Sequence, residues 1–270
     1  MVTEVSSQVL AVERSGGVLR LTLNRPQRLN ALDDELLDAL GAAMVVARDD
    51  DLVRAVLITG AGRGFCAGAD LTGNRLSGDG GSADRGSAVR RTLQRLYAPL
   101  ILGIRELEKP VVAAVNGVAA GAGMSLALAA DLRVCAESAS FIQAFVRIGL
   151  VPDAGSSFFL PRLVGMAKAA ELAMLGEAVG AAEALRIGLV NRVVADELLL
   201  SEGLALASRL AEGPRSVGLA KRALNQSLAS DLRAQLGHEE DLQALALASD
   251  DAVEGVAAFL QKRPAEFRGR

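Results

Sequence analysis

Two turns of small residues and one isolated acid carry the chemistry that this sequence can support. The turns, Ala67–Asp70 and Ala120–Gly123, each follow an apolar run, and small residues let a backbone turn tightly and approach a ligand closely. Main-chain N–H groups from two such turns would form an oxyanion hole, in which each donor contributes roughly 3–4 kcal/mol in other enzymes. Asp153 is the only acid of the apolar loop 149–155. An anion cradle and a lone acid together indicate enolate chemistry.

Each of these features also has a purely structural explanation. Tight turns can require small residues for packing alone, and each turn taken singly favours that explanation. Asp153 can equally cap the helix that is expected after Pro152. A role as a base is favoured by Leu150, Val151 and Pro152, which we expect to desolvate the carboxylate and raise its pKa.

Glycine-rich turns also occur in nucleotide-binding proteins, but these two do not fit that use. Where the dinucleotide fingerprint requires a further glycine, Gly60-x-Gly62 is followed by Phe65 and Gly121-x-Gly123 by Leu126. The chain has no Gly-Lys-Ser/Thr sequence for a phosphate loop. The only histidine, His238, is remote in sequence from both turns, so neither a histidine-based triad nor a metal site built on His and Cys clusters is expected.

The elements that position these residues are predicted from hydrophobic periodicity and turn signals. A valine-rich apolar run at 109–117 predicts a buried strand before the second turn, and residues 53–59 predict another before the first. A helix capped by Asp33 is expected over 33–48. The other predicted elements are a β-hairpin (9–12 and 18–23), helices at 88–108, 167–175 and 181–187, and strands at 132–136 and 190–194.

The rest of the chain divides into a loop and a helical end. Residues 72–87 are rich in Gly, Ser and charge, so we expect a mobile loop that shapes the pocket together with the helix after it. From residue 196 onward the pattern is helical, with breaks at Gly213-Pro214 and Arg263-Pro264. The predicted fold class is therefore α/β, with a core over 1–195 and a helical region over 196–270.

Composition limits the partners and the compartment. With 51% hydrophobic residues, the 270-residue chain can bury a substantial core. The net charge of −3 does not favour binding to nucleic acid or to an acidic membrane surface. With only 3% aromatic residues, stacking on single-stranded nucleic acid is not expected either. The sequence shows no signal-peptide pattern and no run of about 18 apolar residues that could span a bilayer. Cys66 and Cys135 suit a reducing compartment, so we expect a cytoplasmic protein.

The two turns belong to longer motifs that resemble those of the crotonase (enoyl-CoA hydratase/isomerase) superfamily. The motifs are Gly62–Leu71 and Lys109–Gly117, the second followed by the Gly-Ala-Gly turn. The resemblance covers nearly the whole chain, from Leu23 to Pro264. It implies a spiral of ββα units with a C-terminal helical trimerisation region. It further implies an acyl-CoA substrate, no separate cofactor, and a homotrimer or hexamer.

The resemblance also implies roles for individual residues. The N–H groups of Ala69 and Ala122 would bind the thioester oxygen. Residues from three parts of the chain would lie near coenzyme A: Arg28, Leu29, Ala67, Asp70 and Lys262. Lys262 would approach the phosphates from a C-terminal helix of the same or of a neighbouring subunit.

Departures from the family pattern bear on the reaction. Hydratases of this family carry two glutamates, at the positions that are Ser125 and Phe145 here, and we expect these two residues to line the acyl pocket. Adding water requires one group to deprotonate water and another to deliver a proton, so hydration is disfavoured. Asp153 stands where the Δ3,Δ2-enoyl-CoA isomerases carry their acid. The run 144–155 is especially similar to 2-(1,2-epoxy-1,2-dihydrophenyl)acetyl-CoA isomerases.

The predicted function is therefore an acyl-CoA double-bond isomerase in which Asp153 shuttles one proton while the oxyanion hole holds the enolate. Two alternatives stay open. One is another reaction of this family, such as hydration, thioester hydrolysis or ring chemistry, and the other is a catalytically silent acyl-CoA binder. The sequence fixes neither the chain length or ring character of the acyl group nor the choice between trimer and hexamer.

Overall fold

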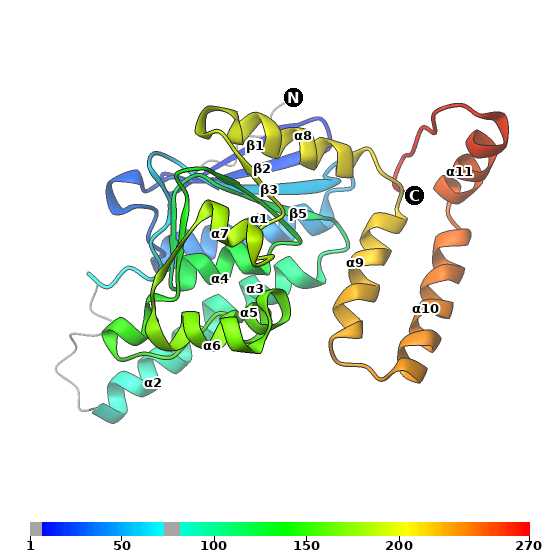
Figure 1. Ribbon diagram of the computed structural model, residues 1–270. Helices are drawn as coiled ribbons and strands as arrows, with labels where there is room; N and C mark the ends of the chain where they lie inside the picture. The colour runs from blue at the N-terminus through cyan, green and yellow to red at the C-terminus, as the bar shows by residue number, and fades with distance from the viewer. Residues whose placement is uncertain (1–6, 73–81) are drawn as a thin grey trace.

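Two β-sheets form the frame on which the two turns lie (Figure 1). The computed structural model describes residues 7–72 and 82–270. Within these residues, the larger sheet has six strands in the order β1-β2-β3-β5-β7-β10, and the smaller has four in the order β4-β6-β8-β9. The larger sheet comprises β1 (Leu10–Ser15), β2 (Val18–Leu23), β3 (Ala55–Gly60), β5 (Val111–Val115), β7 (Leu132–Ala136) and β10 (Arg192–Val194). The smaller comprises β4 (Gly64–Cys66), β6 (Val118–Ala120), β8 (Ser140–Ile142) and β9 (Ala178–Gly180).

A repeating unit builds both sheets. β3, β5 and β7 run parallel as neighbours in the larger sheet, and each is followed by a short strand of the smaller sheet, β4, β6 or β8. Helices close the units: α3 (Ala98–Glu106) follows β4, α4 (Ala122–Ala129) follows β6, and α5 (Ser156–Val164) follows β8. The predicted succession of ββα units is confirmed.

Helices cover the larger sheet and bury its apolar residues. β5 is buried along its whole length, as expected for a parallel strand covered on both faces. α1 (Asp34–Asp49) packs with its predicted apolar face inward, and the Asp33 side chain caps it by accepting a hydrogen bond from the Leu36 N–H at 2.9 Å. α8 (Leu199–Ala211) packs on β3 and β5 (Figure 1), where a Cβ added to Gly203 would lie 3.1 Å from a β5 side chain.

Some predicted loops are partly regular structure. Residues 82–87 of the loop predicted over 72–87 belong to α2 (Ser82–Thr92), which continues through a π-helical turn (Leu93–Tyr97) into α3. Residues 73–81 of that loop lie outside the described residues, so the predicted mobility there stays a prediction. The segments 64–66 and 118–120, for which no strand is predicted from the sequence, form β4 and β6. A strand of three residues is too short to show an alternating pattern.

The chain ends in a helical arm. The remaining helices are α6 (Met166–Leu175), α7 (Ala181–Arg186), α9 (Ser216–Ser227), α10 (Leu232–Leu247) and α11 (Asp250–Gln261), with 3-10 turns at Pro26–Arg28, Ala144–Ile148 and Asp196–Leu198. All described elements after β10 are helical, as predicted. Since α8 still covers the sheet, the arm that leaves the core consists of α9, α10 and α11 (Figure 1).

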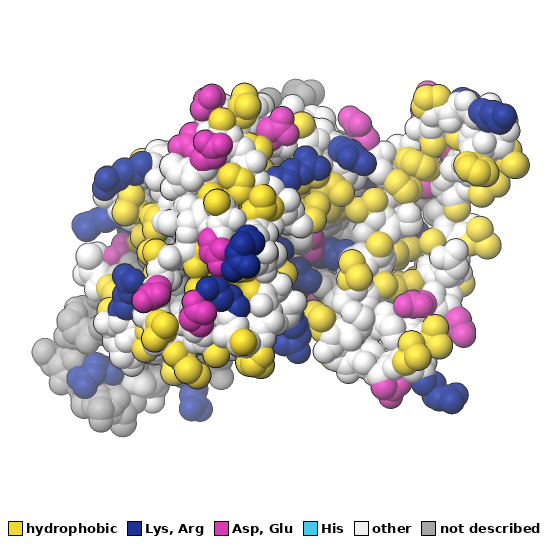
Figure 2. Space-filling view, in the orientation of Figure 1, with side chains coloured by type: hydrophobic (Ala, Val, Ile, Leu, Met, Phe, Trp, Pro, Cys, Tyr) yellow, Lys and Arg dark blue, Asp and Glu magenta, His cyan; other side chains and the backbone are white. Residues whose placement is uncertain are grey.

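Large apolar side chains of this arm are exposed to solvent (Figure 2). Leu232, Phe259 and Leu260 are 75%, 82% and 74% exposed. Contiguous exposed apolar surface marks sites of association. Among the described helices, none combines the length and the apolar character that a membrane crossing requires.

Candidate active site

Three parallel strands of the smaller sheet bring the candidate site together. β4 pairs with β6 and β6 pairs with β8, so that Val118 lies opposite both Gly64 and Ser140. The carboxyl ends of adjacent parallel strands lie at the same edge of a sheet, where ligands of α/β proteins bind. The first turn follows β4 and the second follows β6, so this pairing places the two turns side by side.

Glycines allow the two turns to touch. Gly68 and Gly121 have φ values of +101° and +50°. Residues other than glycine rarely adopt this backbone region. A Cβ added to Gly68 would lie 2.8 Å from the Ala120 carbonyl oxygen and 3.6 Å from the Ala122 nitrogen. A Cβ added to Gly123 would lie 2.1 Å from the carbonyl oxygen of Cys66, the last residue of β4. Packing therefore does require small residues here.

Packing does not explain why the N–H groups of Ala69 and Ala122 are left without acceptors among the described residues. Leu32 donates to the Gly68 carbonyl (2.7 Å) and accepts from the Asp70 N–H (2.9 Å), so the Ala69 N–H between them points away from Leu32. Ala122 is the first residue of α4, and the first N–H groups of a helix have no acceptor within it. Neither N–H donates a hydrogen bond within the described part of the chain. The positive end of the α4 dipole adds to this cradle for an anion.

Asp153 is held beside α4 through its main chain. Its carbonyl oxygen accepts from the Ser156 N–H at 2.9 Å and lies 3.0 Å from the Ser125 hydroxyl of α4. Burial raises the pKa of the Asp153 carboxyl to about 6. Its Oδ1 atom is buried and has no hydrogen-bond partner among the described residues. The predicted direction of the pKa shift is confirmed.

The structure rules out the alternative explanation of Asp153 as a helix cap and corrects part of the expected desolvation. Asp153 does not cap the following helix, because α5 begins at Ser156 with Gly155 as its N-cap and without a side-chain cap. Two of the three residues expected to desolvate the carboxylate are exposed instead: Leu150 is 43% and Val151 is 78% exposed, whereas Pro152 is partly buried. Leu150 and Val151 therefore do not account for the burial of Asp153, while Ala154, which follows it, packs against the hydrophobic core.

The two residues at the positions of the hydratase glutamates both adjoin Gly121. The ring of Phe145 lies 3.9 Å from where a Gly121 Cβ would be. Ser125 is completely buried, and its hydroxyl is 3.2 Å from the Gly121 carbonyl oxygen as well as 3.0 Å from that of Asp153. Neither supplies a carboxylate. That they line the acyl pocket stays a prediction.

Four residues expected near coenzyme A lie on two hydrogen-bonded segments. The Ala67 N–H donates to the Leu29 carbonyl at 2.9 Å. Arg28 is exposed at the end of a 3-10 turn, next to Leu29, and Asp70 follows Ala67 in the first turn. Lys262 ends α11 and lies on the arm, apart from the other four (Figure 1). The role of all five in binding coenzyme A stays a prediction.

Two residues that hold these segments, Arg25 and Asn30, were not predicted from the sequence. The Arg25 guanidinium binds both Asp33 (2.9 Å) and Asp70 (2.8 Å). Hydrogen bonds from Thr72 and Arg25 lower the pKa of Asp70 to about 2. Asn30 is fully buried at φ +56° and donates to the Gly64 carbonyl at 2.7 Å. The available signal was an asparagine, which tolerates positive φ, in a proline-containing loop.

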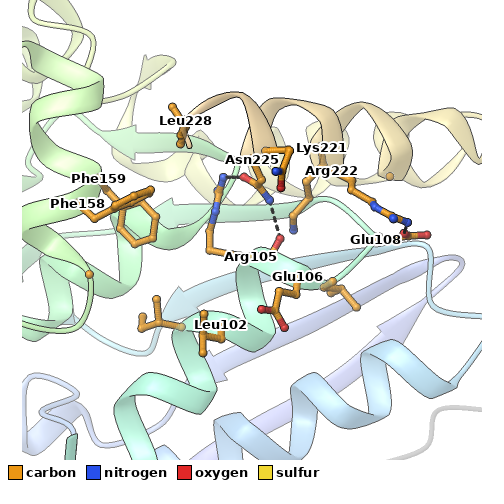
Figure 3. A pocket seen from close by; sticks show the side chains of 15 residues that line it. Leu102, Arg105, Glu106, Glu108, Phe158, Phe159, Lys221, Arg222, Asn225 and Leu228 are labelled. Atoms are coloured by element: carbon orange, nitrogen blue, oxygen red, sulfur yellow. Dashed lines mark hydrogen bonds and ion pairs between the residues drawn. The ribbon is translucent and has the colours of Figure 1, made fainter. Parts of the chain in front are cut away.

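A separate groove of 620 Å³ lies between α3, α5 and α9 (Figure 3). Leu102, Phe158 and Phe159 are among its apolar lining residues, and none of the predicted site residues lines it.

The two arginines that line this groove already have carboxylate partners. Arg105 binds Asp131 at 3.1 Å, and Arg222 binds Glu108 at 3.0 Å. We interpret the groove as the joint between core and arm.

Lys221 fixes this joint, and replacing it is expected to destabilise the protein. It is 7% exposed, and its ammonium group contacts the carbonyls of Ile104 (2.7 Å) and Lys109 (3.1 Å) and the carboxylate of Asp131 (2.8 Å). We expect Lys221→Ala to lower the free energy of unfolding by about 3 kcal/mol, because the buried partners would lose their donor. Urea denaturation measures the change.

The neighbouring Arg222 provides the matched control for Lys221. It lies on the same helix, but its ion pair with Glu108 is exposed. We expect Arg222→Ala to change the free energy of unfolding by less than about 1 kcal/mol. Equal effects of the two substitutions would contradict the role assigned to Lys221.

Comparisons with known proteins place the chain in one family. The family model described as "Enoyl-CoA hydratase/isomerase" matches residues 13–270. The chain is 45% identical to the 1,2-epoxyphenylacetyl-CoA isomerase of Escherichia coli K12 over 94% of this chain and 96% of that protein. It is also 45% identical to a probable enoyl-CoA hydratase of Rhodobacter capsulatus, over 98% and 100% of the two chains. The crystal structure of a putative enoyl-CoA hydratase from Streptomyces coelicolor A3(2) superposes with a TM-score of 0.90 at 38% identity, covering 98% of this chain and 96% of that one.

Proposed function

Because this chain belongs to the enoyl-CoA hydratase/isomerase (crotonase) superfamily, we propose that it is an acyl-CoA double-bond isomerase with Asp153 as its single base. One observation carries the proposal: among the residues that the structure describes, two N–H groups of the site have no acceptor and one buried carboxylate oxygen has no partner. Buried polar groups are normally hydrogen-bonded, and exceptions require an explanation. A bound thioester, whose carbonyl oxygen accepts and whose acidic carbon donates a proton, supplies one.

In the proposed reaction the thioester oxygen accepts hydrogen bonds from the Ala69 and Ala122 N–H groups. The Asp153 carboxylate removes a proton from C2 of a 3-enoyl-CoA, and the electron pair of that C–H bond delocalises into a dienolate held by the two donors. The same carboxyl group, now protonated, returns the proton to C4, which leaves the double bond between C2 and C3. The step needs no cofactor and no co-reactant.

The electrostatics of Asp153 support its use as a base. A general base works best when its pKa lies near the working pH, and burial raises that of Asp153 to about 6. An ordinary aspartate, with a pKa near 3.9, would be a weaker base by about two orders of magnitude in proton affinity. The carboxyl must be ionised to act, so kcat/KM should rise with pH through about 6 and then level off.

Hydration is the second candidate, and the name of the Rhodobacter capsulatus relative favours it. Hydration requires two groups, one that orients and deprotonates water and another that delivers a proton to the substrate. Ser125 and Phe145 occupy the positions where hydratases of this family carry glutamates, and neither ionises in this role. We therefore rank hydration below isomerisation.

Solvent deuterium incorporation with straight-chain and cyclic unsaturated thioesters separates the candidates. An isomerase converts a 3-enoyl-CoA to the 2-enoyl isomer and incorporates deuterium at the exchanging carbons without gaining the mass of water. A hydratase gives the product with that mass gain. A silent binder gives tight binding with neither exchange nor turnover, and that outcome would overturn the proposal.

We also propose that the chain assembles as a trimer or hexamer through the exposed apolar residues of its arm. In such an assembly Lys262 would meet the coenzyme A phosphates of a neighbouring subunit. Coenzyme A enters as part of the substrate, so no separate cofactor is proposed. The two free buried thiols, Cys66 and Cys135, suit the cytoplasm.

A further inference from the structure

We propose that Ser125 is a positioning residue that fixes Asp153 relative to the two N–H donors. The inference rests on the function proposed above. It differs from the prediction that Ser125 lines the acyl pocket, because the side chain has no exposed surface with which to meet a substrate in the described chain.

The Ser125 hydroxyl links the two halves of the site. It stands on the first turn of α4, 3.0 Å from the carbonyl oxygen of Asp153 and 3.2 Å from that of Gly121. Its single proton can be donated to either oxygen. Gly121 directly precedes the donor Ala122, so one buried hydroxyl lies within hydrogen-bond reach of the residue before the oxyanion donor and of the base itself.

The Ser125 hydroxyl supplements the limited packing of the Asp153 loop, in which Ala154 is partly buried against the hydrophobic core. The apolar side chains Leu150 and Val151 of this loop are largely exposed and so contribute little packing. Ala154 has φ +49°, a left-handed conformation that is unfavourable for a residue with a Cβ. Besides the hydroxyl contact, the Asp153 carbonyl has only the local hydrogen bond from the Ser156 N–H among the described residues.

The environment of the Asp153 carboxylate depends on the contact between the Ser125 hydroxyl and the Asp153 carbonyl oxygen. Burial is the sole cause of the raised Asp153 pKa, and no charged side chain of the described residues contributes to it. Loosening the loop from α4 would admit water to the carboxylate and return its pKa toward the ordinary range. It would also displace the base from the substrate carbon.

Two buried serines of the same region provide the test. Ser125 and Ser156 both have no exposed surface, but the Ser156 hydroxyl has no hydrogen-bond partner among the described residues. We expect Ser125→Ala to lower kcat about tenfold with KM nearly unchanged, corresponding to one lost hydrogen bond. Ser156→Ala should leave kcat within about twofold, because no hydrogen bond is lost.

The pH profile distinguishes positioning from general packing. In Ser125→Ala the rising limb of kcat/KM should move to lower pH, whereas in Ser156→Ala it should stay in place. Thermal unfolding of both variants shows that each is folded at the assay temperature. Equal kcat values and unshifted limbs in both variants would overturn the inference.

Asp153→Asn, measured in parallel, separates this inference from the proposed function. If that variant is inactive while Ser125→Ala behaves as wild type, Asp153 is the base and Ser125 does not position it. If Asp153→Asn retains full turnover, the proposed function itself fails, and the role of Ser125 fails with it.

Discussion

Replacement of Asp153 by asparagine should lower kcat for isomerisation of a 3-enoyl-CoA by about 10²–10⁴-fold, the range typical of a lost general base. Asparagine has nearly the same shape but does not accept a proton. The thioester is held by the Ala69 and Ala122 N–H groups and by the coenzyme A contacts, which the substitution leaves in place. Affinity for the substrate should therefore change by less than about threefold.

Kinetics and ligand titration together test this expectation. Turnover is followed by the appearance of the conjugated 2-enoyl thioester, and affinity by titration with a saturated acyl-CoA. Asp196→Asn is a suitable control, because Asp196 is a carboxylate bonded to the Ser138 N–H and belongs to no part of the candidate site. Undiminished turnover in Asp153→Asn would show that another group transfers the proton.

Ala122→Pro should lower kcat by about 10²–10³-fold, because it deletes one donor of the oxyanion hole. Proline lacks an N–H group but is well accommodated at the first position of a helix, which is where Ala122 lies in α4. The dienolate would then keep only the Ala69 donor. The loss should fall mainly on kcat, because charge on the oxygen develops as the proton leaves.

Ala181→Pro controls for the backbone change. Ala181 is likewise the first residue of a helix, α7, and is likewise buried, but it is not part of the oxyanion hole. Circular dichroism and thermal unfolding confirm that both variants fold. If Ala122→Pro turned over the substrate at the wild-type rate, the oxyanion would have to be bound elsewhere.

Elements with strong local patterns could be predicted from sequence. The apolar face of α1 repeats at helical spacing with Asp33 at its start, and β5 is an unbroken apolar run. The acid loop and the two turns were also recognisable, because glycine and a lone acid in apolar surroundings are local features. Each of these signals lies within a few consecutive residues, so no tertiary information is needed to read it.

The remainder depends on contacts between distant residues. β4, β6 and β8 have three residues each, too few for periodicity, and become a sheet only by pairing with one another. The Arg25–Asp70 ion pair spans 45 positions, and the Ser125–Asp153 contact spans 28. The burial of Asp153 was expected from its sequence neighbours, but two of these, Leu150 and Val151, are exposed and do not supply it.

The shortness of the smaller sheet has a consequence for how this protein can vary. Three of its strands, β4, β6 and β8, have three residues each and lead into one component of the site each, and successive residues of a strand face opposite sides. A one-residue insertion between Gly64 and Ala69, or between Val118 and Ala122, would rotate the next N–H group away from the candidate site. Substitutions in these strands are therefore more readily accommodated than any change in their length.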